Sequence, residues 1–151
     1  MPDGKQRQVP KKYLSFTDTD YLAGLNPQKA ERVTKNLLVA NQKTVERWQK
    51  EVIAGIQRAN KGFLKALKNN YSFIVDVDKV IKALDYDKPS LIITGRQDTI
   101  VGYRDQWKLL EIFPRASFAV LDATDHSLQI EAPKIFTALV ENWLKRLKNL
   151  A

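Results

Sequence analysis

The stretch PSLIITGRQD at residues 89–98 decides the fold, because a short apolar run there ends in turn residues and an acid. Residues 90–94 hold this run between a proline and a glycine, a pattern typical of a buried strand. A helical segment follows at 105–112, and a second apolar run comes at 117–122. A strand, a helix and another strand in this order predict a right-handed βαβ unit with two parallel strands.

The region C-terminal to this unit predicts one more helix, from about residue 132 to 148. Pro133 falls in its first turn, where proline is tolerated. An apolar stripe with the helical period runs along it. The stripe consists of Ile135, Phe136, Leu139, Val140, Trp143, Leu144 and Leu147.

The region N-terminal to the unit divides into a polar tail or linker at 1–12 and a helical region at 13–88. From 13 to about 70 only helical patterns occur, with no strand-like alternation. The expected helix starts are Asn26-Pro27, Asn41 or Thr44, and Asn60. The predicted fold class is therefore α/β: a helical N-terminal region followed by a β-α-β-α unit at 89–151 with two parallel strands.

The composition excludes several function classes. The 151 residues suit one domain, and they include no cysteine and one histidine. Disulfides, thiolate chemistry and a multi-histidine metal site are thereby excluded, and no cofactor is implied. No apolar run reaches the roughly 20 residues that span a bilayer. Since the N-terminus also lacks the apolar stretch of a signal peptide, we expect a cytoplasmic protein with no membrane partner.

The net charge of +8 is concentrated in residues 1–88, which hold 17 Lys and Arg against 10 Asp and Glu. One interpretation is an anionic partner such as nucleic acid. The other is a set of solvated helices with lysine on their outer faces. The lysines are interleaved with glutamate and not with aromatic residues, so a nucleic-acid partner is not expected.

Asp98 and His126 are the candidate catalytic residues, because each follows one of the two predicted strands. Polar residues at the carboxyl ends of parallel strands converge at one edge of the sheet. Histidine titrates near neutrality and can take and return a proton. An aspartate bonded to its other ring nitrogen fixes the tautomer and stabilises the imidazolium. The plain alternative is that Asp98 closes a turn and His126 is an ordinary loop residue.

Residues 89–147 resemble the C-terminal part of the α/β-hydrolase family. The resemblance rests on the stretches 89–98, 113–116 and 121–131 and on the apolar stripe of the last helix. Residues 13–88 resemble the helical cap of that family by position and helical pattern alone. The resemblance implies that Asp98 is the triad acid and His126 the general base, in the chain order Ser…Asp…His. The implied parent activity is hydrolysis of an ester or similar bond in a small molecule.

Two departures from the family pattern matter. No G-x-S-x-G nucleophile motif occurs, and Ser127 adjoins His126 too closely to be a promising replacement. We therefore expect a truncated hydrolase that is inactive alone; the alternative is a non-catalytic folded fragment that acts as a protein-interaction module. The family usually has glycine before the histidine, where this chain has Asp125. Either this loop is relaxed because catalysis no longer constrains it, or Asp125 is exposed.

The strand at 90–94 raises the question of partners, because in the parent fold it pairs with a further strand on its other side. Without that neighbour its edge would be open and apolar. Helices from 13–88 folding over the edge, a separate N-terminal half, or self-association would relieve this. For the purified chain we expect a two-fold dimer through antiparallel 90–94 strands.

Overall fold

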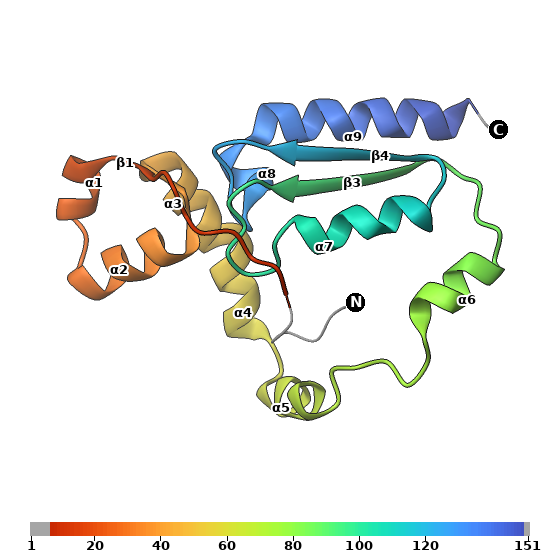
Figure 1. Ribbon diagram of the computed structural model, residues 1–151. Helices are drawn as coiled ribbons and strands as arrows, with labels where there is room; N and C mark the ends of the chain where they lie inside the picture. Colours follow the sequence, from red (N-terminus) through yellow and green to blue (C-terminus); the bar gives the residue numbers. More distant parts are fainter. Residues whose placement is uncertain (1–6, 150–151) are drawn as a thin grey trace.

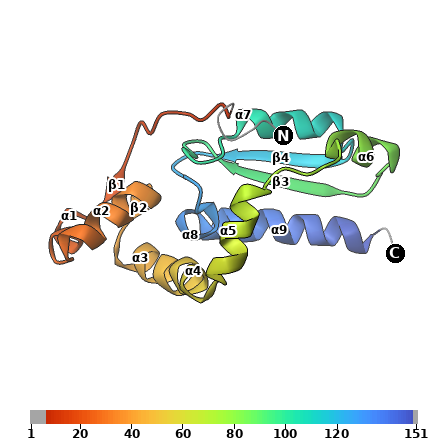
Figure 2. The same ribbon diagram turned by 90° about the horizontal axis from the view of Figure 1, so that it is seen from below.

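A two-stranded parallel sheet lies between two layers of helix in the computed structural model, which describes residues 7–149 (Figure 1). Strand β3 (Ser90–Gly95) pairs with β4 (Ala116–Leu121), in register from Ser90 opposite Ala116 to Gly95 opposite Leu121. Helix α9 (Pro133–Lys148) covers one face, and α7 (Arg104–Trp107) lies on the other (Figures 1 and 2). The predicted α/β class and parallel pair are confirmed.

The crossover between the two strands differs from the continuous helix predicted at 105–112. Helix α7 ends at Trp107, and a 3-10 turn (Lys108–Glu111) follows it. The last helix agrees with its prediction to within a residue. It is anchored to the start of β3 because Trp143 Nε1 donates a hydrogen bond of 2.8 Å to the Pro89 carbonyl oxygen.

The helical region begins with α1 (Thr19–Ala23), α2 (Pro27–Asn36) and α3 (Gln42–Trp48). A π-helical turn (Gln49–Ile53) joins α3 to α4 (Ala54–Arg58). Asn26 caps α2 as predicted. Asn41 caps α3 and forms a capping box with Thr44, so the two residues that the sequence offered as alternatives act together.

The expectation of helix alone between residues 13 and 70 is wrong at two short segments. Strands β1 (Phe16–Thr17) and β2 (Val39–Ala40) form a second parallel pair. The chain leaves α2 because the backbone N–H groups of Leu38 and Val39 donate to the carboxylate of Glu131. A residue more than 90 positions away thus overrides local helical preference.

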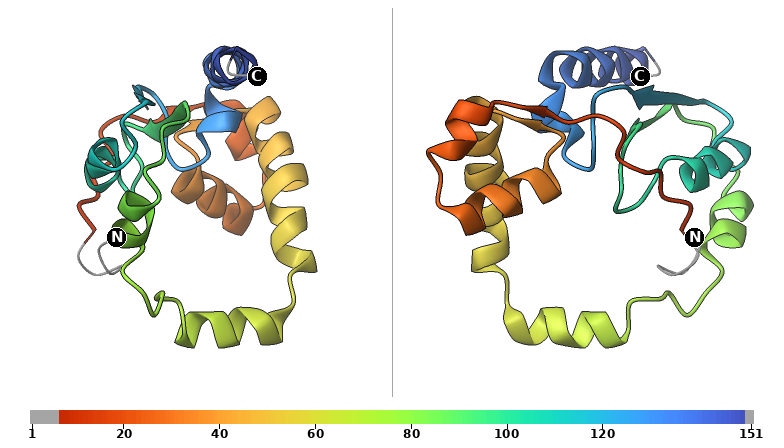
Figure 3. Two further views of the ribbon diagram at one scale, coloured as in Figure 1. Left: turned by 90° about the vertical axis from the view of Figure 1, so that its right-hand side faces the viewer. Right: turned by 60° about the vertical axis from the view of Figure 1, so that its left-hand side comes forward.

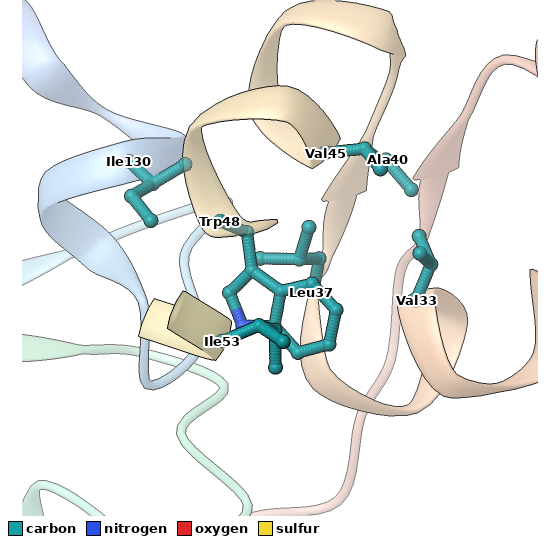
Figure 4. Close-up of a cluster of buried hydrophobic side chains, with 7 residues drawn as sticks. All are labelled: Val33, Leu37, Ala40, Val45, Trp48, Ile53 and Ile130. Atoms are coloured by element: carbon teal, nitrogen blue, oxygen red, sulfur yellow. The ribbon is translucent and has the colours of Figure 1, made fainter. Parts of the chain in front are cut away.

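The main hydrophobic core lies in the helical region and reaches α8 (Leu128–Glu131), which follows the loop that carries His126 (Figure 4). Trp48 is at its centre, and Ile130 joins it from α8 (Figure 4). Its members are Val33, Leu37, Ala40, Val45, Trp48, Ile53 and Ile130. This packing fixes the loop that carries His126 (residues 122–127, the histidine loop) relative to the helical region.

Helices α5 (Lys61–Asn69) and α6 (Val77–Ala83) form an arc that leads away from α4 and returns to β3 (Figure 3). Apolar side chains along this arc, such as Phe63 and Phe73, are exposed. Among residues 7–149, no strand pairs with the outer edge of β3. Nor is any helix in that range long and apolar enough to cross a membrane. Of the predicted tail at 1–12, residues 1–6 lie outside the described chain, as do 150–151 of the C-terminal unit.

Candidate active site

Asp98 lies in the loop that follows β3, and the end of that strand approaches the histidine loop closely. A Cβ atom at Gly95 would collide with the Asp125 carbonyl oxygen, so only glycine fits there. The Asp98 carboxylate is buried. Its Oδ1 accepts hydrogen bonds of 2.9 Å from the backbone N–H groups of Ile100 and Val101. Asp98 therefore does close a turn, and its Oδ2 is left for another partner.

That partner is His126, whose Nδ1 lies 3.0 Å from Asp98 Oδ2. The structure thus brings the two candidate residues together across loops from two strands. The side chain of His126 is 47% exposed. With Asp98 accepting at Nδ1, the neutral ring carries its proton there and presents Nε2 as the basic nitrogen.

The pKa values of the two groups move in the directions that an ion pair requires. The hydrogen bond that His126 donates to Asp98 raises the pKa of His126 against the opposing effect of burial, and the charges of Asp98 and Asp125 raise it further. Burial alone would raise the pKa of Asp98. The hydrogen bonds from His126 and from the backbone N–H groups of Val101 and Ile100 outweigh burial, and the net pKa is lowered.

A pH dependence of stability follows from these directions. The His126 pKa is raised on folding. The contribution of His126 to the free energy of unfolding is therefore complete below its unfolded pKa of about 6.5 and is lost as the pH rises through the folded pKa. The Asp98 pKa is lowered. The contribution of Asp98 to the free energy of unfolding is therefore present above its unfolded pKa of about 3.9 and is lost as the pH falls through its folded pKa.

Asp98→Asn is accordingly expected to lower the pKa of His126, because it removes the carboxylate that stabilises the imidazolium. Since His126 is the only histidine, its ring C–H signals give the titration curve directly by NMR. The matched control is Asp122→Asn, an exposed acid in the same loop. An equal pKa in wild type and Asp98→Asn would mean that the pair does not form in solution.

Asp125 is buried at 1% exposure, so the interpretation that it is an exposed loop residue is wrong. Its Oδ1 accepts from the backbone N–H of Thr99 at 3.1 Å and from that of His126 at 2.8 Å. Its Oδ2 lies 3.1 Å from Lys12 Nζ, an ion pair whose angles fall short of a good hydrogen bond. Asp125 is thus built into the site.

Glu131 and Lys12 complete this arrangement, and the sequence had assigned neither a role. Glu131 accepts from the backbone N–H of Asp125 at 2.7 Å as well as from those of Leu38 and Val39. Burial raises the pKa of Glu131 despite these bonds. Lys12 also donates to backbone carbonyl oxygens of the helical region. The one sequence signal for Glu131 is its position: it is a carboxylate between Ile130 and Pro133, at the edge of an apolar segment.

An open cleft of about 370 Å³ lies between β3 and α9, and His126 is at one end of it. Its lining is mainly apolar: Leu91, Ile93, His126, Leu128, Gln129, Phe136, Val140 and Trp143. Ser127 is buried, and no serine or threonine hydroxyl in residues 7–149 hydrogen-bonds to the His126 ring. That range also holds no group of three or more His, Asp or Glu side chains able to bind a metal ion.

Comparisons with known proteins agree with the fold. No family model and no curated protein matches the sequence. An α/β superfamily hydrolase from Oenococcus oeni PSU-1 is similar in structure, with a TM-score of 0.82 and 26% identity over 97% of this chain and 54% of its own. A candidate lipase from Acinetobacter baumannii AYE shares the fold, with a TM-score of 0.60 and 16% identity over 88% of this chain and 46% of its own.

This chain therefore spans about half the length of the solved structures that it resembles. It contains the helical region, the parallel pair and the two loops with Asp98 and His126 in the order that the resemblance implied. The chain resembles the α/β-hydrolases and has the fold of one half of the solved structures to which it is similar.

Proposed function

We propose that this chain is the acid–histidine half of a hydrolase that cleaves an ester or similar bond in a small molecule. The observation that carries the proposal is the contact of 3.0 Å between Asp98 Oδ2 and His126 Nδ1. A buried acid on a half-exposed histidine beside an apolar cleft is the arrangement that a general base requires. The similarity to the Oenococcus oeni hydrolase supports the same reaction class.

In this reaction His126 Nε2 would take the proton of a serine hydroxyl as that oxygen attacks the substrate carbonyl. The ring would then return the proton to the leaving group. Asp98 would hold the Nδ1–H tautomer and stabilise the imidazolium. The serine and the oxyanion-hole donors would come from an N-terminal half outside these residues, because the 151 residues contain no G-x-S-x-G motif.

The outer edge of β3 is where that half would bind. The N–H groups of Ser90 and Arg96 donate toward β4, to the carbonyl oxygens of Arg115 and Leu121. Because N–H directions alternate along a strand, those of Leu91 and Ile93 face the outer edge. The side chains of these two residues line the apolar cleft. An added strand would therefore complete the sheet and fill the cleft in one step.

The test is ester hydrolysis by the chain alone. The isolated protein is expected to hydrolyse activated esters no faster than its His126→Ala variant, because it lacks both the covalent step and the oxyanion stabilisation. Ser127→Ala serves as a further comparison. A saturable rate well above both variants would instead identify Ser127 as a nucleophile in this chain.

A non-catalytic interaction module is the alternative function. The exposed apolar side chains of the α5–α6 arc favour it, since large exposed apolar side chains on one segment are typical of a binding surface. The coding sequence upstream of these 151 residues distinguishes the two proposals. A half with a G-x-S-x-G motif encoded there would support the hydrolase. The expected cytoplasmic location stays a prediction that cell fractionation tests.

Without its N-terminal half, the purified chain is expected to form a two-fold dimer through antiparallel β3 edges. Ile93→Pro should abolish the dimer and keep the fold, because it removes an outward N–H that β4 does not use. Light scattering gives the mass, with Ile74→Pro in the exposed arc as the matched control. A wild-type monomer at micromolar concentration, or a dimer that survives Ile93→Pro, would rule out this pairing.

A further inference from the structure

Two loops must stay together for Asp98 to reach His126: the acid loop (residues 96–101) and the histidine loop (residues 122–127). They follow different strands, and the contact between the two side chains spans 28 residues of sequence. His126 is half exposed, so packing alone does not fix its ring. The backbone of the histidine loop must therefore be held by other contacts.

Asp125 supplies contacts at the points nearest to both side chains. Its Oδ1 joins the N–H of Thr99, the residue after Asp98, to the N–H of His126 itself. One oxygen atom thus bridges the acid loop and the histidine loop within a residue of each candidate catalytic group.

We propose that Asp125 is a positioning residue that holds His126 against Asp98 by tying these two loops together. The inference rests on the proposed roles of Asp98 and His126. It assigns Asp125 an action through His126 and no contact with substrate.

Lys12 offsets the cost of burying the Asp125 carboxylate, and Glu131 holds the backbone of the same loop. Lys12 Nζ lies 3.1 Å from Asp125 Oδ2 and compensates a charge that would otherwise be costly to bury. Glu131 accepts the Asp125 N–H and holds the same loop to the chain at Leu38 and Val39. The two hydrogen bonds accepted by Asp125 Oδ1 are called the tether below. Lys12 links Asp125 to the helical region, and Glu131 links it to α8.

Other contacts keep the two loops folded when the tether is removed. Gln97 N donates to the Thr124 carbonyl oxygen at 3.0 Å, and Arg96 N donates to that of Leu121 at 2.8 Å. Neither contact involves Asp125 or reaches the His126 ring. A variant at Asp125 can thus lose the alignment of His126 while the loops remain in place.

The experiment compares two variants that differ in the tether alone. In a Lys12→Met background, Asp125→Asn keeps an oxygen that accepts from Thr99 and His126, whereas Asp125→Ala removes it. Both lack the charge of Asp125, so its direct effect on the histidine is the same. The other charged groups that act on His126 are Asp98 and Arg7. Arg7 is unchanged throughout, and Asp98 is changed in the same way in both variants.

The readout is the shift in the His126 pKa when Asp98→Asn is added to each variant, measured by NMR on the single histidine. Circular dichroism checks that each protein is folded. We expect the Asp98-dependent shift to be retained in Asp125→Asn and to be clearly smaller in Asp125→Ala. Equal shifts in the two variants would overturn the proposal. Since no catalysis is measured, this result is independent of whether the chain belongs to an active hydrolase.

A wild-type measurement covers the case in which Asp125→Ala does not fold. The amide hydrogens of Thr99 and His126 are expected to exchange with solvent more slowly than in an unstructured peptide, because both are bonded to Asp125. Exchange of both at the unstructured rate would show that the tether is absent and would also overturn the proposal.

Discussion

Joining this chain to an N-terminal α/β-hydrolase half with a serine nucleophile is expected to produce saturable ester hydrolysis, and His126→Ala is expected to lower kcat by about 10⁴-fold or more. The loss is large because His126 would be the only base for the serine proton. Asp98→Asn should lower kcat by a similar factor of about 10⁴, because the ring would then present the wrong tautomer.

The part of the Oenococcus oeni hydrolase that this chain does not cover is a suitable donor of the N-terminal half, since this chain aligns with 54% of that protein. The donor rejoined to its own C-terminal half is the positive control. Asp122→Asn is the matched control for charge, because Asp122 is exposed in the histidine loop. A folded assembly that hydrolyses ester equally well with His126→Ala would contradict the proposed function.

Trp48→Ala is expected to lower the free energy of unfolding by about 3–5 kcal/mol, because it leaves a large cavity in a small core. Trp48 is 5% exposed at the centre of the cluster that links α2, α3 and α8. Few side chains share this core, so the neighbours have little capacity to fill the space. The loss is a large fraction of the stability of a typical domain, about 5–15 kcal/mol.

The matched control for Trp48 is Trp107→Ala. Trp107 is 58% exposed and packs edge-on against Phe118. Its removal should cost clearly less than that of Trp48, because the ring pair is worth only about 0.5–1.5 kcal/mol beyond area burial and the ring is already more than half exposed. Urea midpoints measure both variants. A larger loss for Trp107 than for Trp48 would place the stabilising core in the α/β unit, contrary to the packing described above.

The parallel strands could be predicted because their signals are local. The run at 90–94 is bounded by proline and glycine, and the caps at Asn26 and Asn60 stand directly before helical patterns. Asp98 and His126 were found as a pair because each follows a strand, and the ends of parallel strands meet. The structure brings them together at 3.0 Å.

The elements that were not predicted depend on distant residues. β2 forms where Glu131 takes the N–H groups of Leu38 and Val39, and no local pattern records this. The burial of Asp125 likewise needs Lys12, from a segment that reads as a polar tail. A carboxylate in a loop is usually solvated. The burial of Asp125 can therefore be recognised only when the segment with Lys12, the acid loop and the histidine loop are placed together.

The location of the nucleophile is tested most directly by a fluorophosphonate, which forms a covalent bond with activated serines, followed by mass spectrometry. We predict that this chain alone remains unlabelled, and that in the joined assembly the serine of the N-terminal half is labelled in a reaction that His126→Ala abolishes. Stoichiometric labelling of the isolated chain, at Ser127 or any other serine, would contradict it.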